Sequence, residues 1–404
     1  MTSTVYIAKN VYGGDGMGRL GDGRVVFVKG AWAGEQVKAK MVQEKKNFVK
    51  ADLVEVVESS PQRIEGAPER LMPGCVYATL SYQAECEVKE SQLREMLERA
   101  RLIDADFPVK TFGANKQVRP LNYRNKAVYH FEKTDNSWVI GYRREPQHDI
   151  IDIKEDPLAV KEINAKLPEI RKSVLQLLTT GPHSVRRDIQ RCGNVTVRWS
   201  EKTGVKWWVG QPPKDLVFRE VTNSLTFEVP AGGFYQMNPQ VGALLVDYVV
   251  KEYSKDPRDL IDLYCGVGVF GLSCFSKTKS PFIRSLIGVE SGREAIDFAK
   301  KNAMALGVKA EFTAGQVIRN LNKITINETT MVIVDPPRGG MERGVPEFLE
   351  RSKASKIIYV SCDPATLVRD LKVLSKSYRI DDIAWFNMFS RTARFETVIT
   401  LLKK

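Results

Sequence analysis

The stretch Lys356–Asp370, KIIYVSCDPATLVRD, joins a strand pattern to a helix pattern. Its first half, Ile357–Val360, is apolar and rich in β-branched residues, which predicts a buried parallel strand. Its second half begins with Asp363 and Pro364, which are typical of a helix cap and a first helical position. Cys362 stands at the junction, where the positive end of a helix dipole would favour the thiolate form. The pattern allows a reactive nucleophile here, and it also allows the small buried hydrophobe that a free cysteine usually is.

The same order of strand and then helix recurs through residues 231–404. Strand-like runs end at Leu263, Val289, Thr313 and Val334, and helix-forming segments separate most of them. This alternation predicts a doubly wound α/β domain with a Rossmann-like sheet. Ligands of such domains bind at the carboxyl ends of the strands.

A glycine-rich turn follows the first of these strands, in the stretch Asp262–Gly271, DLYCGVGVFG. Gly266, Gly268 and Gly271 match G-x-G-x-x-G, and Glu290 closes the next strand 19 residues after Gly271. Such a turn with a carboxylate behind it binds an adenosine cofactor, either a dinucleotide or S-adenosylmethionine. The turn alone leaves both cofactors open, and a glycine turn needed only for tight packing is a third alternative.

Length and composition indicate several globular domains. The chain has 404 residues, of which 43% are hydrophobic and 27% charged. No window approaches the ~18 apolar residues of a membrane span, so no membrane association is expected. Six scattered cysteines without a Cys-x-x-Cys pair argue against disulfides and against a zinc site, and predict a cytoplasmic location. The formal charge of +12 favours an anionic partner, with nucleic acid first.

Residues 1–58 are predicted to form a small β-barrel. Glycines punctuate the connections between four segments of strand-like composition: Val5–Lys9, Arg24–Lys29, Gln36–Met41 and Val49–Val57. Lysines cluster in and after the third segment, as in barrels that follow a nucleic-acid backbone. The stretch Gly13–Gly34 resembles a TRAM domain, an OB-like RNA-binding barrel attached to RNA-modifying enzymes. A protein-binding module of similar size is the alternative.

Residues 59–230 are predicted to form a mixed, strand-rich central domain. Residues 81–103 have helical periodicity and are expected to pack on the catalytic domain, and residues 158–180 are also helical. Basic and aromatic residues interleave along the strand-like pieces between them. Interleaving of this kind fits an RNA groove, and a half-exposed sheet produces it as often. The third domain, residues 231–404, carries the catalytic motifs.

Two further motifs complete the pattern. Val332–Gly340, VIVDPPRGG, places an acidic residue and two prolines after a buried strand, which hydride transfer does not require. Arg394–Val398, RFETV, follows near the end of the chain. In this order, with the Cys362 stretch between them, the motifs resemble those of the RNA uracil-C5 methyltransferases, which make 5-methyluridine. The resemblance covers nearly the whole chain and is to the 23S ribosomal RNA branch, in which a TRAM-like domain is usual.

The resemblance implies a role for each motif residue. Cys362 is the nucleophile that adds to C6 of uracil, and Glu396 is the base that removes the C5 proton. The cofactor is S-adenosylmethionine, and no metal takes part. A base inside folded RNA must leave its stack to reach Cys362. The residues expected around the cofactor are Gln236, Tyr264, Gly266, Gly268, Glu290, Gln316 and Asp335.

Three positions of the catalytic domain depart from the family pattern. Val269 stands where asparagine or a similar polar residue is common, so one cofactor contact is expected to be missing. Arg391 and Arg394 stand where histidines are common. A guanidinium close to Glu396 would favour the ionised carboxylate and weaken it as a base.

Many members of the family also hold an iron–sulfur cluster through four cysteines, the middle two in a Cys-Gly-Gly-Cys stretch. The corresponding stretch here is Met72–Cys75, with one cysteine. The first ligand position corresponds to Gly66 and the last to Asp156. One cysteine cannot hold a cubane cluster, so we expect no cluster.

Two other classes of function are open. A dehydrogenase could use the G-x-G-x-x-G turn, but it leaves Cys362, Asp335 and the basic N-terminus without a role. A catalytically silent RNA-binding protein is compatible with the substitutions near Glu396. We expect a cytoplasmic RNA uridine C5-methyltransferase that acts on 23S ribosomal RNA, with transfer RNA as the near alternative. No obligate protein partner is expected.

Overall fold

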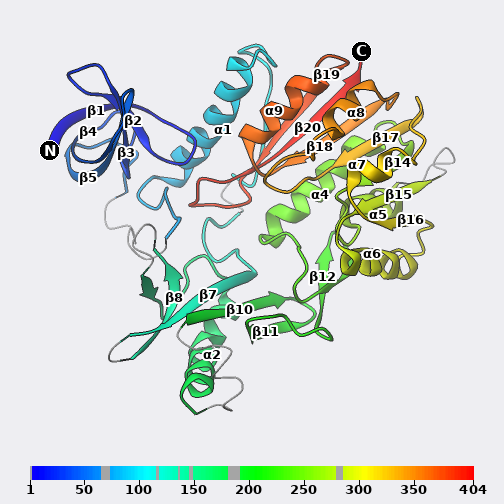
Figure 1. Ribbon diagram of the computed structural model, residues 1–404, viewed down its shortest axis with the longest axis horizontal. Helices are drawn as coiled ribbons and strands as arrows, with labels where there is room; N and C mark the ends of the chain where they lie inside the picture. Colours follow the sequence, from blue (N-terminus) through cyan, green and yellow to red (C-terminus); the bar gives the residue numbers. More distant parts are fainter. Residues whose placement is uncertain are drawn as a thin grey trace. The chain divides into compact units, whose positions relative to one another are not determined.

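The computed structural model (Figure 1) describes residues 2–64, 73–114, 118–134, 137–144, 149–180, 192–278 and 285–404. The chain divides into two compact units. The first is Met1–Met96 with Phe389–Phe395, and the second is Leu97–Met388 with Glu396–Lys404. Among the described residues, we find no helix with the length and apolar character that crossing a membrane demands.

The first unit contains the predicted β-barrel, which is closed and has the strand order β1-β2-β3-β5-β4. Alternate residues of its strands are buried and fill the interior, as the period of two along a strand requires. Closure leaves the short barrel without an open sheet edge. Its strands are β1 (Thr2–Asn10), β2 (Gly16–Arg19), β3 (Val25–Lys29), β4 (Gln36–Glu44) and β5 (Phe48–Glu58).

Strand β2 lies inside a stretch that the sequence pattern assigned to a glycine-rich connection. Gly16 and Gly18 are part of this strand. Glycine is needed at both positions because the neighbouring residues leave no room for a side chain. An added Cβ at Gly16 would lie 2.7 Å from the Ala31 carbonyl oxygen, and one at Gly18 would lie 2.6 Å from a methyl group of Val5. These glycines let the strands pack closely, although a glycine-rich stretch in a sequence usually indicates a loop.

Helix α1, Tyr82–Arg99, follows the barrel and corresponds to the helix predicted over residues 81–103. A five-stranded antiparallel sheet, with the order β11-β10-β7-β8-β9, comes next. Helix α2 (Lys161–Thr180) covers one face of it with a buried stripe spaced three to four residues apart. Each such buried aliphatic side chain contributes about 1.5–3 kcal/mol. The strands of this sheet are β7 (Lys126–Lys133), β8 (Trp138–Arg143), β9 (Ile150–Asp152), β10 (Cys192–Ser200) and β11 (Gly204–Val209).

A hairpin, β12 (Val217–Thr222) and β13 (Leu225–Pro230), leads into the C-terminal part of the chain. There an eight-stranded sheet has the order β16-β15-β14-β17-β18-β20-β19-β6. The predicted Rossmann-like parallel sheet is thus confirmed for five strands: β14 (Asp259–Leu263), β15 (Leu286–Glu290), β16 (Glu311–Ala314), β17 (Thr330–Val334) and β18 (Lys356–Ser361).

The other three strands of this sheet were not predicted. β20 (Glu396–Lys403) runs antiparallel between β18 and β19 (Tyr378–Phe386), so the last strand of the chain is inserted into the sheet. β6 (Lys110–Phe112) pairs with the end of β19, although it lies within the segment 59–230 that we assigned to a central domain. The pairings of β18 with β20 and of β19 with β6 join residues far apart in sequence, and no local pattern reports them.

Helices alternate with the parallel strands (Figure 1). Two of them begin with an N-cap side chain followed by proline at the first position, the chemistry that favours a helix start. These are α4, capped by Asn238, and α9, capped by Asp363. The helices are α4 (Pro239–Ser254), α5 (Val269–Lys277), α6 (Arg293–Ala305), α7 (Val317–Leu321), α8 (Val345–Arg351) and α9 (Pro364–Leu374).

Candidate active site

Four of the predicted site residues lie at the carboxyl ends of neighbouring strands. Tyr264 follows β14, Glu290 ends β15, Asp335 follows β17 and Cys362 follows β18. β14 pairs in parallel with β15 and β17, and β17 pairs in parallel with β18. The four side chains therefore share one edge of the sheet, which is where ligands bind in open α/β sheets.

Glu396 reaches the same edge from the opposite chain direction. It is the first residue of β20, and Thr397 next to it pairs with Ser361 at the end of β18. The start of β20 therefore lies beside the end of β18. This antiparallel insertion brings the predicted base next to the predicted nucleophile, Cys362.

The junction that carries Cys362 has the geometry that its sequence predicts. Oδ1 of Asp363 accepts hydrogen bonds from the backbone N–H groups of Ala365 at 3.0 Å and Thr366 at 3.2 Å. The Ser361 hydroxyl donates to the Asp363 carbonyl at 3.1 Å. The turn between strand and helix is thus fixed by local hydrogen bonds, and Cys362 is held in it, partly exposed.

The prediction that the helix dipole favours the thiolate is wrong for the structure as described. Burial, and after it the nearby carboxyl groups of Glu396 and Asp335, raises the pKa of the Cys362 thiol to about 12. Arg338 acts in the opposite direction. Desolvation, the largest cause, outweighs the dipole, so the resting thiol holds its proton at neutral pH.

Arg338→Gln is therefore expected to slow alkylation of Cys362 by iodoacetamide. Only the thiolate reacts, so the rate should rise about tenfold per pH unit from pH 7 to 9 in the wild type. Loss of the Arg338 cation raises the thiol pKa and lowers the rate at each pH. Mass spectrometry of the Cys362 peptide measures this rate. The control is Arg343→Gln, an exposed arginine nearby in sequence. A rate that levels off near pH 7, or an Arg338→Gln variant that reacts faster, contradicts this assignment.

Glu396 is buried, with 5% of its surface exposed. Burial raises its pKa well above the ordinary value, Asp335 adds to the shift, and Arg338 opposes it. Within the described part of the chain, its Oε2 has no hydrogen-bond partner. A buried carboxyl group with a raised pKa and a vacant acceptor suits a group that must take up a proton from a substrate.

The cation that acts on Glu396 is thus Arg338, and the raised pKa corrects our expectation of an ionised carboxylate. Arg391 has other partners within its own unit. Its Nη1 donates to the Leu80 carbonyl at 2.7 Å, and its backbone N–H donates to Glu85 at 2.8 Å. Lys89 Nζ also donates to Glu85, at 2.7 Å. The Arg394 backbone N–H donates to the Thr392 hydroxyl at 3.2 Å.

Glu290 closes over the glycine turn as the motif predicts. Its Oε2 accepts from the Gly266 N–H at 3.3 Å, and its Oε1 accepts from the Gly292 N–H at 2.8 Å and the Ser291 hydroxyl at 2.8 Å. Gly268 has φ of +87°, a left-handed conformation that favours glycine. This arrangement leaves a fixed carboxylate beside the turn, as the hydroxyls of a ribose require.

Carboxyl groups gather behind this turn. Asp262 is fully buried and its Oδ2 accepts from the Gly271 N–H at 2.9 Å. Burial raises the pKa of Asp262 to about 7, and burial with the charges of Asp262 and Glu290 raises the pKa of Asp335 to about 8. Three acidic groups in one place favour a cationic sulfonium and disfavour a pyrophosphate. The donor set therefore fits S-adenosylmethionine better than a dinucleotide.

The remaining predicted residues, Tyr264, Gln236 and Gln316, are each held by local contacts. Tyr264 has φ of +62°, which is strained for a tyrosine, and its hydroxyl accepts from the Glu342 N–H at 3.1 Å. Gln236 is 9% exposed and packs closely on Gly242. A Cβ added at Gly242 would lie 2.8 Å from the Cβ of Gln236. Gln316 follows β16 and caps α7 only through its backbone.

Val269 begins helix α5 and offers no polar atom in its side chain. Asp262 and Arg338 are the two charged residues to which we assigned no role from sequence. Both lie within motifs already quoted, Asp262 at the start of the glycine turn and Arg338 after Asp335. In the sequence, Asp262 and Arg338 are recognisable only as charged residues next to a motif. Their neighbours in the folded sheet are not predicted by the sequence.

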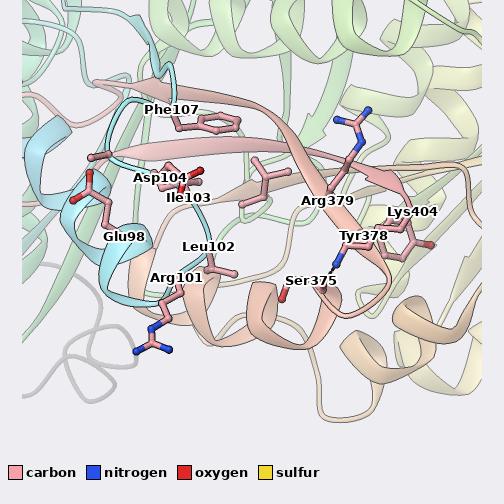
Figure 2. Close-up of a pocket in the computed structure, with 12 residues that line it drawn as sticks. Glu98, Arg101, Leu102, Ile103, Asp104, Phe107, Ser375, Tyr378, Arg379 and Lys404 are labelled. Carbon is pink, nitrogen blue, oxygen red and sulfur yellow. Dashed lines mark hydrogen bonds between the residues drawn. The ribbon is translucent and has the colours of Figure 1, made fainter.

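A separate open hollow of about 830 Å³ lies beside the start of β19 (Figure 2). Its lining includes Arg101 and Asp104, which follow α1, and Tyr378 and Arg379 of β19. Because Tyr378 pairs with Lys403 at the end of β20, this hollow lies at the amino ends of the parallel strands. It is therefore at the opposite edge of the sheet from Cys362.

Asp156, at the last of the four cluster-ligand positions, is fully buried and occupied by hydrogen bonds. Its Oδ2 accepts from the hydroxyls of Tyr142 at 2.7 Å and Tyr129 at 3.0 Å. Its Oδ1 accepts from the N–H groups of Leu158 at 2.9 Å and Ala159 at 3.2 Å. A carboxylate with both oxygens bound in this way is a structural hub and does not fit an iron ligand.

We predict that protein purified without oxygen contains no stoichiometric iron and is colourless. Cys75 is the one cysteine among the four corresponding ligand positions, Gly66 lies outside the described residues, and the described residues hold no cluster of metal-binding side chains. Elemental analysis and a visible spectrum test this. Several iron atoms per chain with absorbance in the visible range would show that the ligands lie elsewhere.

The sheet order, the glycine turn and the carboxyl groups at its edge define an S-adenosylmethionine-dependent methyltransferase. The family model described as tRNA (Uracil-5-)-methyltransferase matches residues 215–404, and the TRAM domain model matches residues 2–54. The tRNA (uracil(54)-C(5))-methyltransferase of Schizosaccharomyces pombe is 30% identical over 419 residues, which cover 96% of this chain and 76% of that protein. The chain therefore belongs to the tRNA (uracil-5-)-methyltransferase family, and it is an RNA uracil-C5 methyltransferase that uses S-adenosylmethionine.

Two further comparisons extend over the whole chain. An RNA methyltransferase of Thermotoga maritima is 28% identical over 455 residues, covering 100% of this chain and 99% of that protein. The fold is that of the crystal structure of Pyrococcus abyssi tRNA (uracil-54, C5)-methyltransferase in complex with S-adenosyl-L-homocysteine. That structure matches with a TM-score of 0.73 at 23% identity, over 98% of this chain and 100% of that chain.

Proposed function

We propose that this protein methylates C5 of a uridine in transfer RNA through a covalent bond between Cys362 and C6 of the base. The observation that carries this proposal is the pairing of β18 with β20. It sets Cys362 beside Glu396, at the edge where Glu290 and Asp335 also lie. A nucleophile, a buried base and a cofactor cradle thus occupy one edge.

The chemistry explains why a thiol is needed. C5 of uracil is a poor nucleophile. The Cys362 thiol loses its proton to solvent, and the thiolate adds to C6, which moves the C5–C6 electron pair onto the ring as an enolate. S-adenosylmethionine, when bound, would supply the methyl group that C5 takes and would leave as S-adenosylhomocysteine. Arg338 favours the thiolate, and we propose that it assists this addition.

Glu396 completes the cycle. Once Glu396 has lost its own proton to solvent, its carboxylate takes the proton from C5, the C5–C6 double bond forms again, and the bond between Cys362 and C6 breaks to release the thiolate. The raised pKa of Glu396 makes the ionised carboxylate a strong base once it forms. We propose that Gln236, Tyr264, Gly266, Gly268, Glu290, Gln316 and Asp335 hold the cofactor.

The choice of transfer RNA rests on the relatives. Our expectation of 23S ribosomal RNA depended on the TRAM-like domain. The S. pombe and P. abyssi proteins are named for uracil 54 of transfer RNA, and their matches cover 96% and 98% of this chain. An N-terminal barrel therefore does not argue against transfer RNA. We further propose a cytoplasmic location, since five of the six cysteines are in no disulfide bond in the described residues.

The test is methyl transfer from labelled S-adenosylmethionine to separated RNA pools of a strain without the gene. We expect incorporation into transfer RNA, with 5-methyluridine at one position by mass spectrometry. Incorporation into 23S ribosomal RNA alone would contradict transfer RNA as the substrate and would leave the enzyme class unchanged. Absence of 5-methyluridine from both pools would contradict the proposed function.

The variant Lys40→Gln/Lys45→Gln/Lys46→Gln is expected to weaken RNA binding and its salt dependence. These lysines are exposed on and after β4, and removal of one bound phosphate lowers the log–log salt slope by about 0.7–0.9. Binding of S-adenosylhomocysteine should not change. Lys38→Gln is the matched control, because Lys38 is paired with Glu55 at 2.8 Å. An unchanged slope in the triple variant would mean that this face does not bind RNA.

A further inference from the structure

We propose that Arg198, which lies outside every catalytic motif, is a positioning residue for the cofactor site through the loop of residues 230–236. Arg198 is in β10 of the antiparallel sheet, and the loop connects β13 to the segment before α4. The loop carries Gln236, so the inference rests on the proposed role of Gln236.

The guanidinium of Arg198 is hydrogen-bonded to the backbone of this loop. Its Nη1 donates to the carbonyl oxygens of Pro230 at 3.3 Å, Ala231 at 3.3 Å and Gly233 at 3.2 Å. Arg198 is 1% exposed. One buried cationic donor thus gathers three carbonyl groups from four successive residues, and this sets the course of the chain toward Gln236.

The loop makes a tight turn beside the Arg198 guanidinium. The Gly233 N–H donates back to the Pro230 carbonyl at 2.8 Å. A Cβ at Gly233 would lie 2.9 Å from Cδ of Pro230, and one at Gly232 would lie 2.9 Å from Cγ of Pro212. Two glycines are therefore required where the loop turns around the guanidinium.

The charge of Arg198 is balanced by a buried partner. Its Nη2 donates to Oε1 of Glu220 at 2.8 Å, and Phe218 lies under the guanidinium, 4.5 Å from carbon to ring centroid. Burial lowers the pKa of Arg198 and raises the pKa of Glu220. Both shifts show that burial opposes the charged pair, so the pair is a poor source of stability and serves geometry instead.

The other end of the loop is held independently. The Asn125 N–H donates to the Met237 carbonyl at 2.9 Å, and Asn238 caps α4 by accepting from the Val241 N–H at 3.3 Å. With both ends fixed, Gln236 stays largely buried while Phe234 remains 69% exposed. At the Arg198 end the Ala231 N–H also donates to the Leu216 carbonyl at 2.9 Å, and the Tyr235 hydroxyl is hydrogen-bonded to Thr222. Arg198 is the side chain that binds three carbonyl groups of this end.

A matched control lies on the helix that covers the same sheet. Arg171 of α2 also donates to two carbonyl oxygens, those of Ile140 and Ile153, both at 2.7 Å, and pairs with Asp152 at 2.7 Å. These carbonyls belong to β8 and the residue after β9, which contribute nothing to the cofactor edge. Arg171→Met therefore removes a similar set of hydrogen bonds without touching the loop.

The experiment measures S-adenosylhomocysteine binding by calorimetry on the full chain, with melting temperature and steady-state kinetics alongside. For Arg198→Met we expect the Kd of S-adenosylhomocysteine to rise about tenfold or more, as removal of a charge-assisted hydrogen-bond network predicts. The KM for S-adenosylmethionine should rise with it. Arg171→Met should lower the melting temperature and leave both constants unchanged. Glu220→Gln, which keeps an acceptor, should give a smaller rise.

Wild-type Kd and KM in a folded Arg198→Met variant would overturn the proposal. So would an equal loss of binding in Arg171→Met, since that would mark general destabilisation. If Arg198→Met does not fold, Arg198→Lys and Glu220→Gln decide, and wild-type cofactor binding in both contradicts the proposal. Because binding is measured without RNA, a wild type that binds S-adenosylhomocysteine and methylates no uridine would refute the proposed function separately.

Discussion

The Cys362→Ala variant is expected to bind RNA and S-adenosylmethionine like the wild type and to transfer no methyl group. Without addition at C6, C5 has too little electron density to take the methyl group. Removal of a catalytic nucleophile lowers kcat by on the order of 10⁶-fold. Single-turnover transfer of labelled methyl into transfer RNA, with calorimetry for the cofactor and filter binding for RNA, measures both halves of the prediction.

Cys75→Ala provides the control for loss of a thiol. Cys75 is also partly exposed and in no disulfide bond, and it lies in the other unit of the chain. It should keep wild-type turnover. Single-turnover product from Cys362→Ala at more than a trace would contradict covalent catalysis, and failure of this variant to bind RNA would mean that it reports on structure.

The Glu396→Gln variant is expected to stop after methyl transfer and before release. Thiolate addition does not need the base, but proton removal from C5 does, so a methylated RNA–protein adduct should accumulate with ordinary uridine RNA. Loss of a general base typically slows a reaction by about 10²–10⁴-fold, which leaves the adduct time to appear on a denaturing gel. Turnover at the wild-type rate without an adduct would give this role to another group, and Asp335 is then the next to test.

Glu396→Gln should also make the protein more stable at high pH. The pKa of Glu396 is raised in the folded state, so between the unfolded and folded pKa values the folded protein binds a proton that the unfolded chain releases. Stability from this group therefore falls as pH rises through that window. The variant removes this decline, so its melting temperature relative to the wild type should increase from pH 5 to pH 8. An opposite trend would mean that Glu396 is ionised in the fold.

The parallel part of the fold follows from local pattern. β14, β15, β17 and β18 are short apolar runs followed by turn or cap residues, and each places its motif residue where the strand ends. The cap by Asp363 and Pro364 could be read directly from the chain. These strands can be predicted from the sequence because the apolar run and the turn or cap residues that end it lie within about ten residues of each other.

The properties of the site depended on distant partners. Cys362 sits at a helix start, as predicted, but its pKa is set by desolvation and by carboxyl groups from β20 and from the loop after β17. Arg391 is five residues from Glu396, yet its partner is Glu85. Proximity in sequence suggested the wrong cation, and Arg338, distant in the chain, is the one that acts on Glu396. Charge effects follow three-dimensional proximity, which local pattern does not contain.

The measurement that tests covalent catalysis most directly uses transfer RNA containing 5-fluorouridine. Fluorine cannot leave C5 as a proton, so the last step is blocked while addition and methyl transfer proceed. With S-adenosylmethionine, the wild type should form a complex that survives denaturation, with the mass of protein plus RNA plus one methyl group. Digestion should locate the bond at Cys362. Absence of any such complex, or a bond at another cysteine such as Cys75, would contradict the mechanism.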